Sequence, residues 1–248
     1  MKYKYNLIAL TGPIFSEGMT GATFDKRISR ANRKTVRFDC RDYVRYYIDW
    51  VKNSNEKYKL VYLAWDSDYS LISEHFGAEI SVINVGAPES KFRAKWQFEP
   101  FVHDNFLSFI EQDACEKILR IRSDVKLDMN AVNKSFMSLG DTFGKIIVPY
   151  IASEGRMQDF YFGGTTNFLV QFCKNIKNGH QDIHGPHYDA LLCQTSLRHL
   201  RWAHKFKLKY LKHLSRYVGS KMQVALDKSI YVNLEWRGEK FVTLYGHM

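Results

Sequence analysis

The feature that most constrains the fold is the alternation of short apolar runs with segments of helical periodicity. The runs that predict strands are residues 5–10, 59–65, 80–85, 117–124, 145–150 and 159–164. The segments that predict helices are residues 39–52, 70–76, 91–112 with an interruption near Pro100, 130–139 and 165–176. Strands that alternate with helices form a largely parallel sheet with both faces covered. We therefore predict an α/β fold, with a loop containing Gly18 and Gly21 after the first strand.

The chain has 248 residues, of which 45% are hydrophobic and 25% charged, so it can bury the core of one sizeable α/β domain. It has no low-complexity tract or obvious linker, and we predict a single domain over residues 1–248. No run approaches the roughly twenty apolar residues that cross a bilayer, and we expect a cytoplasmic, soluble or peripheral chain. The four cysteines are Cys40, Cys115, Cys173 and Cys193. Their wide spacing predicts reduced thiols and not a zinc site.

The net charge of +10 indicates an anionic partner, which can be a nucleic acid, an anionic membrane surface or a phosphorylated ligand. Residues 190–226 contain eight lysines and arginines and no acidic residue. Within them, the spacing predicts a basic amphipathic helix over residues 190–218. Such a helix can lie on an anionic leaflet, cover a core with a solvated outer face, or bind nucleic acid, although no recognisable nucleic-acid motif accompanies it.

The predicted strand over residues 117–124 ends in Arg122-Ser123-Asp124. In open α/β sheets, ligands bind outside the carboxyl ends of the strands. A carboxylate there can hold a metal ion on a diphosphate, and a guanidinium offers a fork to phosphate oxygens. The alternative is that Arg122 simply pairs with Asp124 and no metal binds.

An Asp-x-Asp sequence occurs earlier, at Asp66-Ser67-Asp68, directly after the second main strand. Aspartate and serine at such a position are common in turns and at helix starts, and we favour that interpretation. The alternative is a metal-dependent nuclease that uses Asp66 and Asp68.

Three short motifs resemble the WavE-type lipopolysaccharide-biosynthesis proteins, a family assigned as glycosyltransferases. The motifs are residues 10–14 (Leu-Thr-Gly-Pro-Ile), 118–124 (Ile-Leu-Arg-Ile-Arg-Ser-Asp) and 159–164 (Asp-Phe-Tyr-Phe-Gly-Gly). The chain departs from that family at residues 91–97, where an asparagine and an Arg-Gln pair are expected. Residues 162–165 and 187–189 look similar to stretches of the retaining α-1,3-galactosyltransferase and blood-group transferase family.

Both resemblances imply a GT-A-like, Rossmann-like fold and transfer of a sugar from a nucleotide-sugar donor to a glycan or lipid-linked glycan acceptor, in polysaccharide biosynthesis. Residues 1–125 would form the nucleotide-sugar-binding half and residues 126–248 the acceptor-side half, with the basic helix on the inner face of a membrane. A divalent metal, Mn²⁺ or Mg²⁺, would sit on Asp124, with His247 as a second ligand. The implied donor-binding residues are Thr11, Gly12, Pro13, Arg122, Ser123, Asp124, Gly163 and Gly164.

A transferase of this kind needs a carboxylate near the reacting centre, as a base toward the acceptor hydroxyl if the reaction inverts the sugar. The candidates, in order of preference, are Asp189, Asp159 and Glu154. Asp189 follows His184 and His187 at the start of an apolar helical run, where a helix dipole also explains an aspartate. Inversion and retention both stay open, and a non-enzymatic binder of nucleic acid or acidic polymer is the opposing class.

Overall fold

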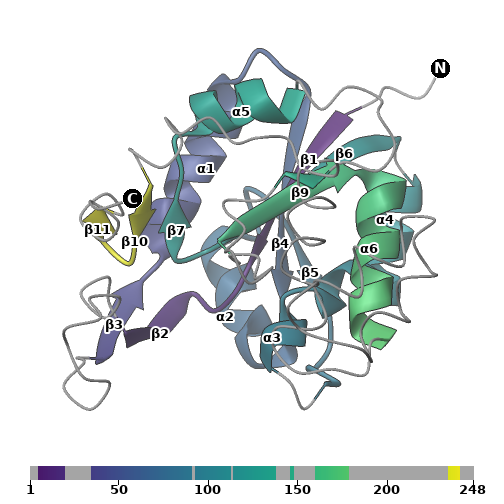
Figure 1. Cartoon of the computed structure of the whole chain (residues 1–248). Helices are drawn as coiled ribbons and strands as arrows, with labels where there is room; N and C mark the ends of the chain where they lie inside the picture. Colours follow the sequence, from purple (N-terminus) through teal and green to yellow (C-terminus); the bar gives the residue numbers. More distant parts are fainter. Residues whose placement is uncertain are drawn as a thin grey trace, which may run out of the picture.

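The computed structural model describes residues 5–19, 35–90, 93–112, 114–137, 146–147, 160–178 and 234–240. Its main sheet has the order β5-β4-β1-β6-β9-β8 (Figure 1). The parallel strands are β1 (Tyr5–Thr11), β4 (Tyr58–Ala64), β5 (Ser81–Asn84) and β6 (Cys115–Arg122). Two strands are antiparallel, β8 (Ile146–Ile147) and β9 (Tyr161–Thr165). The predicted α/β fold with a mostly parallel sheet is confirmed.

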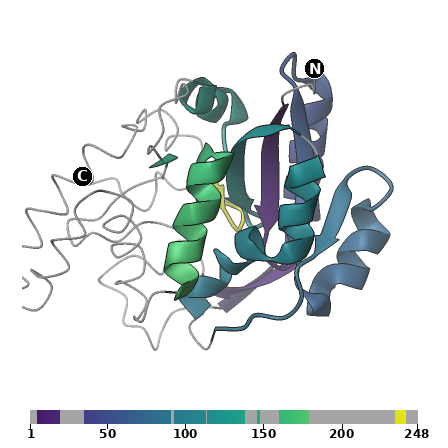
Figure 2. The same ribbon diagram turned by 90° about the vertical axis from the view of Figure 1, so that its right-hand side faces the viewer.

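Helices cover both faces of the sheet because alternate side chains of each strand point to opposite sides. Ile8 and Leu10 of β1 pack in the same core as α1 (Arg41–Asn53), α2 (Asp66–Phe76) and α5 (Met129–Met137). Leu7 and Ala9 pack in a second core with η3 (Glu99–Val102), α4 (Asp104–Gln112) and α6 (Thr166–Asn178). With that second face toward the viewer, α4 and α6 lie in front of the sheet (Figure 2). The molecule is thus a three-layer sandwich.

One predicted helix is confirmed and one predicted loop differs from the structure. The helix expected over residues 91–112, with an interruption near Pro100, is divided into α3 (Arg93–Trp96), η3 and α4 around that proline, which has no amide hydrogen to continue a helix. The loop expected around Gly18 is instead β2 (Phe15–Met19), which pairs with β3 (Thr35–Asp39). A hairpin therefore separates β1 from α1.

Other predictions fall partly outside the described residues. Gly21, Cys193 and the basic helix over residues 190–218 are not among them. Cys40, Cys115 and Cys173 are thiols, as predicted. Within the described part of the chain, no helix is long and apolar enough to span a bilayer.

A small sheet joins the end of the described chain to the middle. A hairpin of β10 (Glu235–Trp236) and β11 (Glu239–Lys240) pairs through β10 with β7 (Val125–Lys126), in the order β11-β10-β7. Its turn has positive φ at both central residues, 49° at Arg237 and 81° at Gly238, as tight hairpins require. This brings Arg237 to the end of β6.

Tyrosines of α1 form hydrogen bonds with this small sheet. The Tyr47 hydroxyl donates to the carbonyl of Val125 at 2.8 Å and accepts from the amide of Leu127 at 3.1 Å. The Tyr43 hydroxyl accepts from the amide of Gly238 at 3.0 Å. The position of β7 and of the C-terminal hairpin therefore depends on side chains of α1.

We predict that Tyr47→Phe lowers the free energy of unfolding by about 1–3 kcal/mol, because it leaves a buried carbonyl and a buried amide without their shared partner. Urea denaturation followed by circular dichroism measures the change. Tyr69→Phe is a suitable control, since this half-buried side chain lies in α2, away from β7. Equal stability of Tyr47→Phe and the unchanged chain would contradict this role of α1.

Candidate functional site

The main sheet has a topological switch point at its centre. After β1 the chain builds β4 and β5 on one side, and it then crosses to place β6 on the other side of β1. Thr11 at the end of β1 lies directly beside Arg122 at the end of β6. In open α/β sheets the segments that leave two such strands diverge and form the ligand-binding crevice. The motifs at residues 11–13 and 122–124 therefore meet at this position.

Hydrogen bonds tie the two motifs together. The Ser123 amide donates to the carbonyl of Thr11 and its hydroxyl to the carbonyl of Pro13, each at 2.9 Å. The Tyr62 hydroxyl donates to the carbonyl of Gly12, also at 2.9 Å. Gly12 has a φ of 113°, and a Cβ there would lie 2.9 Å from Ser123 Oγ. The turn after β1 thus requires glycine. Among the predicted donor-binding residues of this turn and strand end, Thr11 and Ser123 are buried and Pro13 is exposed.

A buried arginine lies beneath this turn. Arg120 is 3% exposed, and its Nε donates to Thr11 Oγ1 at 2.7 Å. Its guanidinium also lies 5.2 Å from the centre of the Phe162 ring. Arg120 was not predicted as a site residue, because an arginine inside a strand gives no sign in the sequence that it is buried. It adds positive charge directly behind the carboxyl end of β1.

The Asp124 carboxylate accepts hydrogen bonds from four side chains. Arg122 binds it through both oxygens, Nε to Oδ1 at 2.8 Å and Nη2 to Oδ2 at 2.7 Å. Oδ2 also accepts from Arg237 Nε at 2.9 Å, from Ser16 Oγ at 2.9 Å and from Trp236 Nε1 at 3.2 Å. Asp124 thereby connects β2, the end of β6 and the C-terminal hairpin. We call these five residues the Asp124 cluster.

The Asp124 cluster favours an ionised carboxylate. Burial alone would raise the pKa of Asp124, but the charges of Arg122 and Arg237 and the hydrogen bonds of Arg122 and Ser16 outweigh it and hold the pKa well below its ordinary value. Nearby, burial raises the pKa of the Cys40 thiol to about 12. Asp124 is therefore a permanent anion at neutral pH, and Cys40 stays protonated.

The surroundings of Asp124 do not fit a divalent metal. Both carboxylate oxygens already accept from side chains, and a cation bound to Oδ2 would lie about 5 Å from each guanidinium. At an effective dielectric constant of about 20, each guanidinium would repel it by about 7 kcal/mol. Among the residues that the structure describes, no three His, Cys, Asp or Glu side chains gather to hold a metal. The structure shows the Arg122–Asp124 ion pair that the sequence analysis gave as an alternative.

Aromatic rings and close packing hold the two arginines in place. The Arg237 guanidinium lies 5.0 Å from the Trp236 ring centre, and that of Arg122 lies 5.8 Å from the same ring. A Cβ on Gly18 would lie 2.3 Å from Arg237 Nη1. Arg237 and Trp236 were not predicted, because Arg-Gly is not among the pairs, such as Asn-Gly and Asp-Gly, that indicate a tight hairpin.

Gly163 and Gly164 lie elsewhere. They are inside β9, which passes directly into α6 as the sequence predicts, and they pair with Leu119 and Ile118 of β6 and with residues of β8. The two glycines therefore lie beside the middle of β6 and not at the carboxyl edge of the parallel strands. A Cβ on Gly163 would lie 2.8 Å from the carbonyl oxygen of Ile118. The structure gives Gly163 a packing role, and the predicted sugar contact is without support.

The remaining candidates have mixed outcomes. Asp159, Glu154, Asp189 and His247, together with His184 and His187, lie outside the described residues, so their roles stay predictions. Asp66 and Asp68 lie in the first turn of α2, just inside the helix start that the sequence favoured. The Ser67 hydroxyl donates to Asp68 Oδ2 at 3.0 Å.

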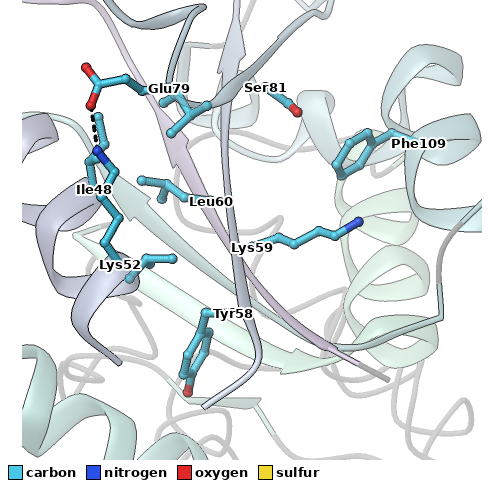
Figure 3. A pocket seen from close by; sticks show the side chains of 10 residues that line it. Ile48, Lys52, Tyr58, Lys59, Leu60, Glu79, Ser81 and Phe109 are labelled. Atoms are coloured by element: carbon cyan, nitrogen blue, oxygen red, sulfur yellow. Dashed lines mark hydrogen bonds and ion pairs between the residues drawn. The ribbon is translucent and has the colours of Figure 1, made fainter. Parts of the chain in front are cut away.

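Two hollows lie elsewhere on the described structure. The larger, of about 310 Å³, opens at the amino ends of β4 and β5, beside the Lys52–Glu79 ion pair of 2.8 Å (Figure 3). The smaller, of about 170 Å³, lies at the carboxyl ends of the same strands, against Trp65 and Val85. Only the smaller one shares the sheet edge of the switch point.

No family model matches the sequence, and neither does any curated protein. The WavE resemblance therefore rests on the three short motifs. Among solved structures, a protein from Desulfovibrio desulfuricans G20, provisionally assigned as a nucleotide-diphospho-sugar transferase, is similar at 10% identity with a TM-score of 0.43, over 90% of this chain and 100% of that one. The inositol-1-phosphate CTP transferase of T. maritima is similar at 13% identity with a TM-score of 0.40, over 78% and 83%. At these TM-scores the neighbours' activities are not evidence of function here.

Proposed function

We propose that this protein is a transferase that uses a nucleotide-sugar as donor and a glycan or lipid-linked glycan as acceptor. The observation that carries the proposal is the switch point between β1 and β6. There, a turn that requires glycine lies beside a strand end carrying an arginine and a serine. A glycine turn lets backbone amides approach a ligand closely, and guanidiniums bind phosphate oxygens. A nucleoside diphosphate supplies matching oxygens.

The candidate catalytic carboxylates and the basic segment lie outside the described residues. One of Asp189, Asp159 and Glu154 would act as the carboxylate at the reacting centre, and the basic segment over residues 190–218 would bring the enzyme to an anionic membrane surface that carries the acceptor. The net charge of +10 supports an anionic partner of this kind.

Nucleotide binding tests the proposal. We expect one nucleoside diphosphate from a panel of UDP, GDP, CDP, dTDP and ADP to stabilise the protein by about 2.7 kcal/mol at a hundredfold excess over its dissociation constant. Differential scanning fluorimetry measures the shift, and incubation with the matching nucleotide-sugars tests for release of the diphosphate. Failure of every nucleotide to bind, together with salt-sensitive binding of nucleic acid, would favour the non-enzymatic class.

A further inference from the structure

We propose that the donor diphosphate is neutralised by Arg122, with Arg237 beside it, and that Asp124 positions these guanidiniums instead of holding a metal ion. This inference rests on the proposed function, since it names the groups that receive the donor at the same site. It departs from the metal-on-Asp124 arrangement that the resemblance implies.

The first support is how Asp124 is bound. A metal ligand must present a lone pair toward the ion, but Asp124 Oδ2 accepts from four side chains and Oδ1 is bound by Arg122 Nε. The Asp124 side chain is only 3% exposed. Binding a metal here would require the displacement of the guanidiniums that hold the carboxylate in place.

The second support is the position of Arg122. It is the last residue of β6 and lies beside Thr11, at the switch point where a donor is expected. Its side chain is 19% exposed, against 8% for Arg237 and 3% for Asp124. Arg122 is therefore the most exposed member of this ion-paired group.

The third support is the chemistry of the group. A guanidinium is planar, permanently charged and carries five N–H donors. The two-point contact with Asp124 fixes the plane of Arg122, and the Trp236 ring lies between 5.0 and 5.8 Å from both guanidinium carbons. A fork held in this way loses little freedom when it binds a second anion. It can stabilise the charge that develops on a leaving diphosphate, as a metal ion otherwise does.

Isothermal titration calorimetry of the full chain tests this assignment, with the same five nucleoside diphosphates in excess EDTA and again in Mn²⁺. We expect the dissociation constant of the bound nucleotide to agree within about twofold between the two conditions, because no metal on Asp124 is required. Arg122→Met should weaken binding about tenfold or more, and Arg122→Lys should weaken it less, because lysine keeps the charge but not the fork.

The matched control is Arg41→Met. It breaks the exposed ion pair with Asp39 at the end of the β2–β3 hairpin and should leave nucleotide affinity unchanged. Asp124→Asn should weaken binding without creating or removing any response to Mn²⁺. Thermal melting of each variant separates loss of binding from loss of folding, and Arg237→Lys is a second test if Arg122→Met does not fold.

Binding that occurs only with Mn²⁺ or Mg²⁺, or an Arg122→Met variant that folds and binds normally, would overturn this assignment while leaving the proposed function intact. Absence of binding by every nucleotide under both conditions would overturn the proposed function and this inference together.

Discussion

Replacing Asp124 with alanine should lower the free energy of unfolding by about 3–5 kcal/mol, the cost of removing one partner from a buried ion pair. Asp124 is 2% exposed and is the acceptor that Arg122, Arg237, Ser16 and Trp236 share. Its loss removes the side-chain hydrogen bonds that join the C-terminal hairpin to β2 and to the end of β6. Urea denaturation at neutral pH measures the effect.

The control for this prediction is Asp39→Ala. The ion pair of Asp39 with Arg41 joins side chains that are 42% and 44% exposed, so its loss should cost less than about 1 kcal/mol. If Asp124→Ala were no more destabilising than Asp39→Ala, the Asp124 cluster would not be a main source of stability.

The destabilisation caused by Asp124→Ala should depend on pH. The pKa of Asp124 is lowered in the folded protein, so its stabilising contribution is complete above the ordinary carboxyl value of 3.8 and is lost as the pH falls below it. The difference in stability between the unchanged chain and Asp124→Ala should therefore be constant near neutral pH and smaller at about pH 3.

Gly163→Ala should destabilise the protein by about 3 kcal/mol or more, at the upper end of the usual cost of overpacking. Its Cβ would lie 2.8 Å from the Ile118 carbonyl oxygen, 3.1 Å from Leu119 Cδ1 and 3.2 Å from Leu119 Cα. Two of these atoms belong to the backbone of β6, which cannot move without disturbing the pairing of β6 with β1.

The sign of this change is decisive. Without a close approach, alanine in a strand is more favourable than glycine by about 0.5–1 kcal/mol, so an unconstrained position would be stabilised. Thermal unfolding of Gly163→Ala distinguishes the two cases. An increase in stability would contradict the packing role that we assign to Gly163.

Much of the fold follows from the sequence because its elements are strongly periodic. The strands β1 and β4 contain continuous apolar runs, as is typical of strands buried on both faces, and α1 shows a regular apolar face. The hairpin of β2 and β3 is not evident from the sequence because each strand has only five residues and β3 has no fully buried side chain. Its pairing depends on a partner strand that local periodicity does not reveal.

The site was predictable only in part. The carboxyl-edge rule placed residues 122–124 at the carboxyl end of a strand, and the structure adds residues 11–13 beside them. Two partners of Asp124 could not be predicted from the local sequence, because Ser16 and Arg237 lie 108 and 113 residues away from it. A carboxylate at a strand end has the same local sequence whether it faces a metal or two arginines. Only the tertiary contacts distinguish these environments.

The central claim is that a nucleoside diphosphate binds at the carboxyl ends of β1 and β6. A crystal structure of the protein with the nucleotide selected by calorimetry tests it most directly. Our account predicts the diphosphate beside the turn at Gly12, with its oxygens within hydrogen-bonding distance of the Arg122 guanidinium. A nucleotide bound at the opposite edge of the sheet, such as in the hollow beside Lys52 and Glu79 (Figure 3), would contradict it.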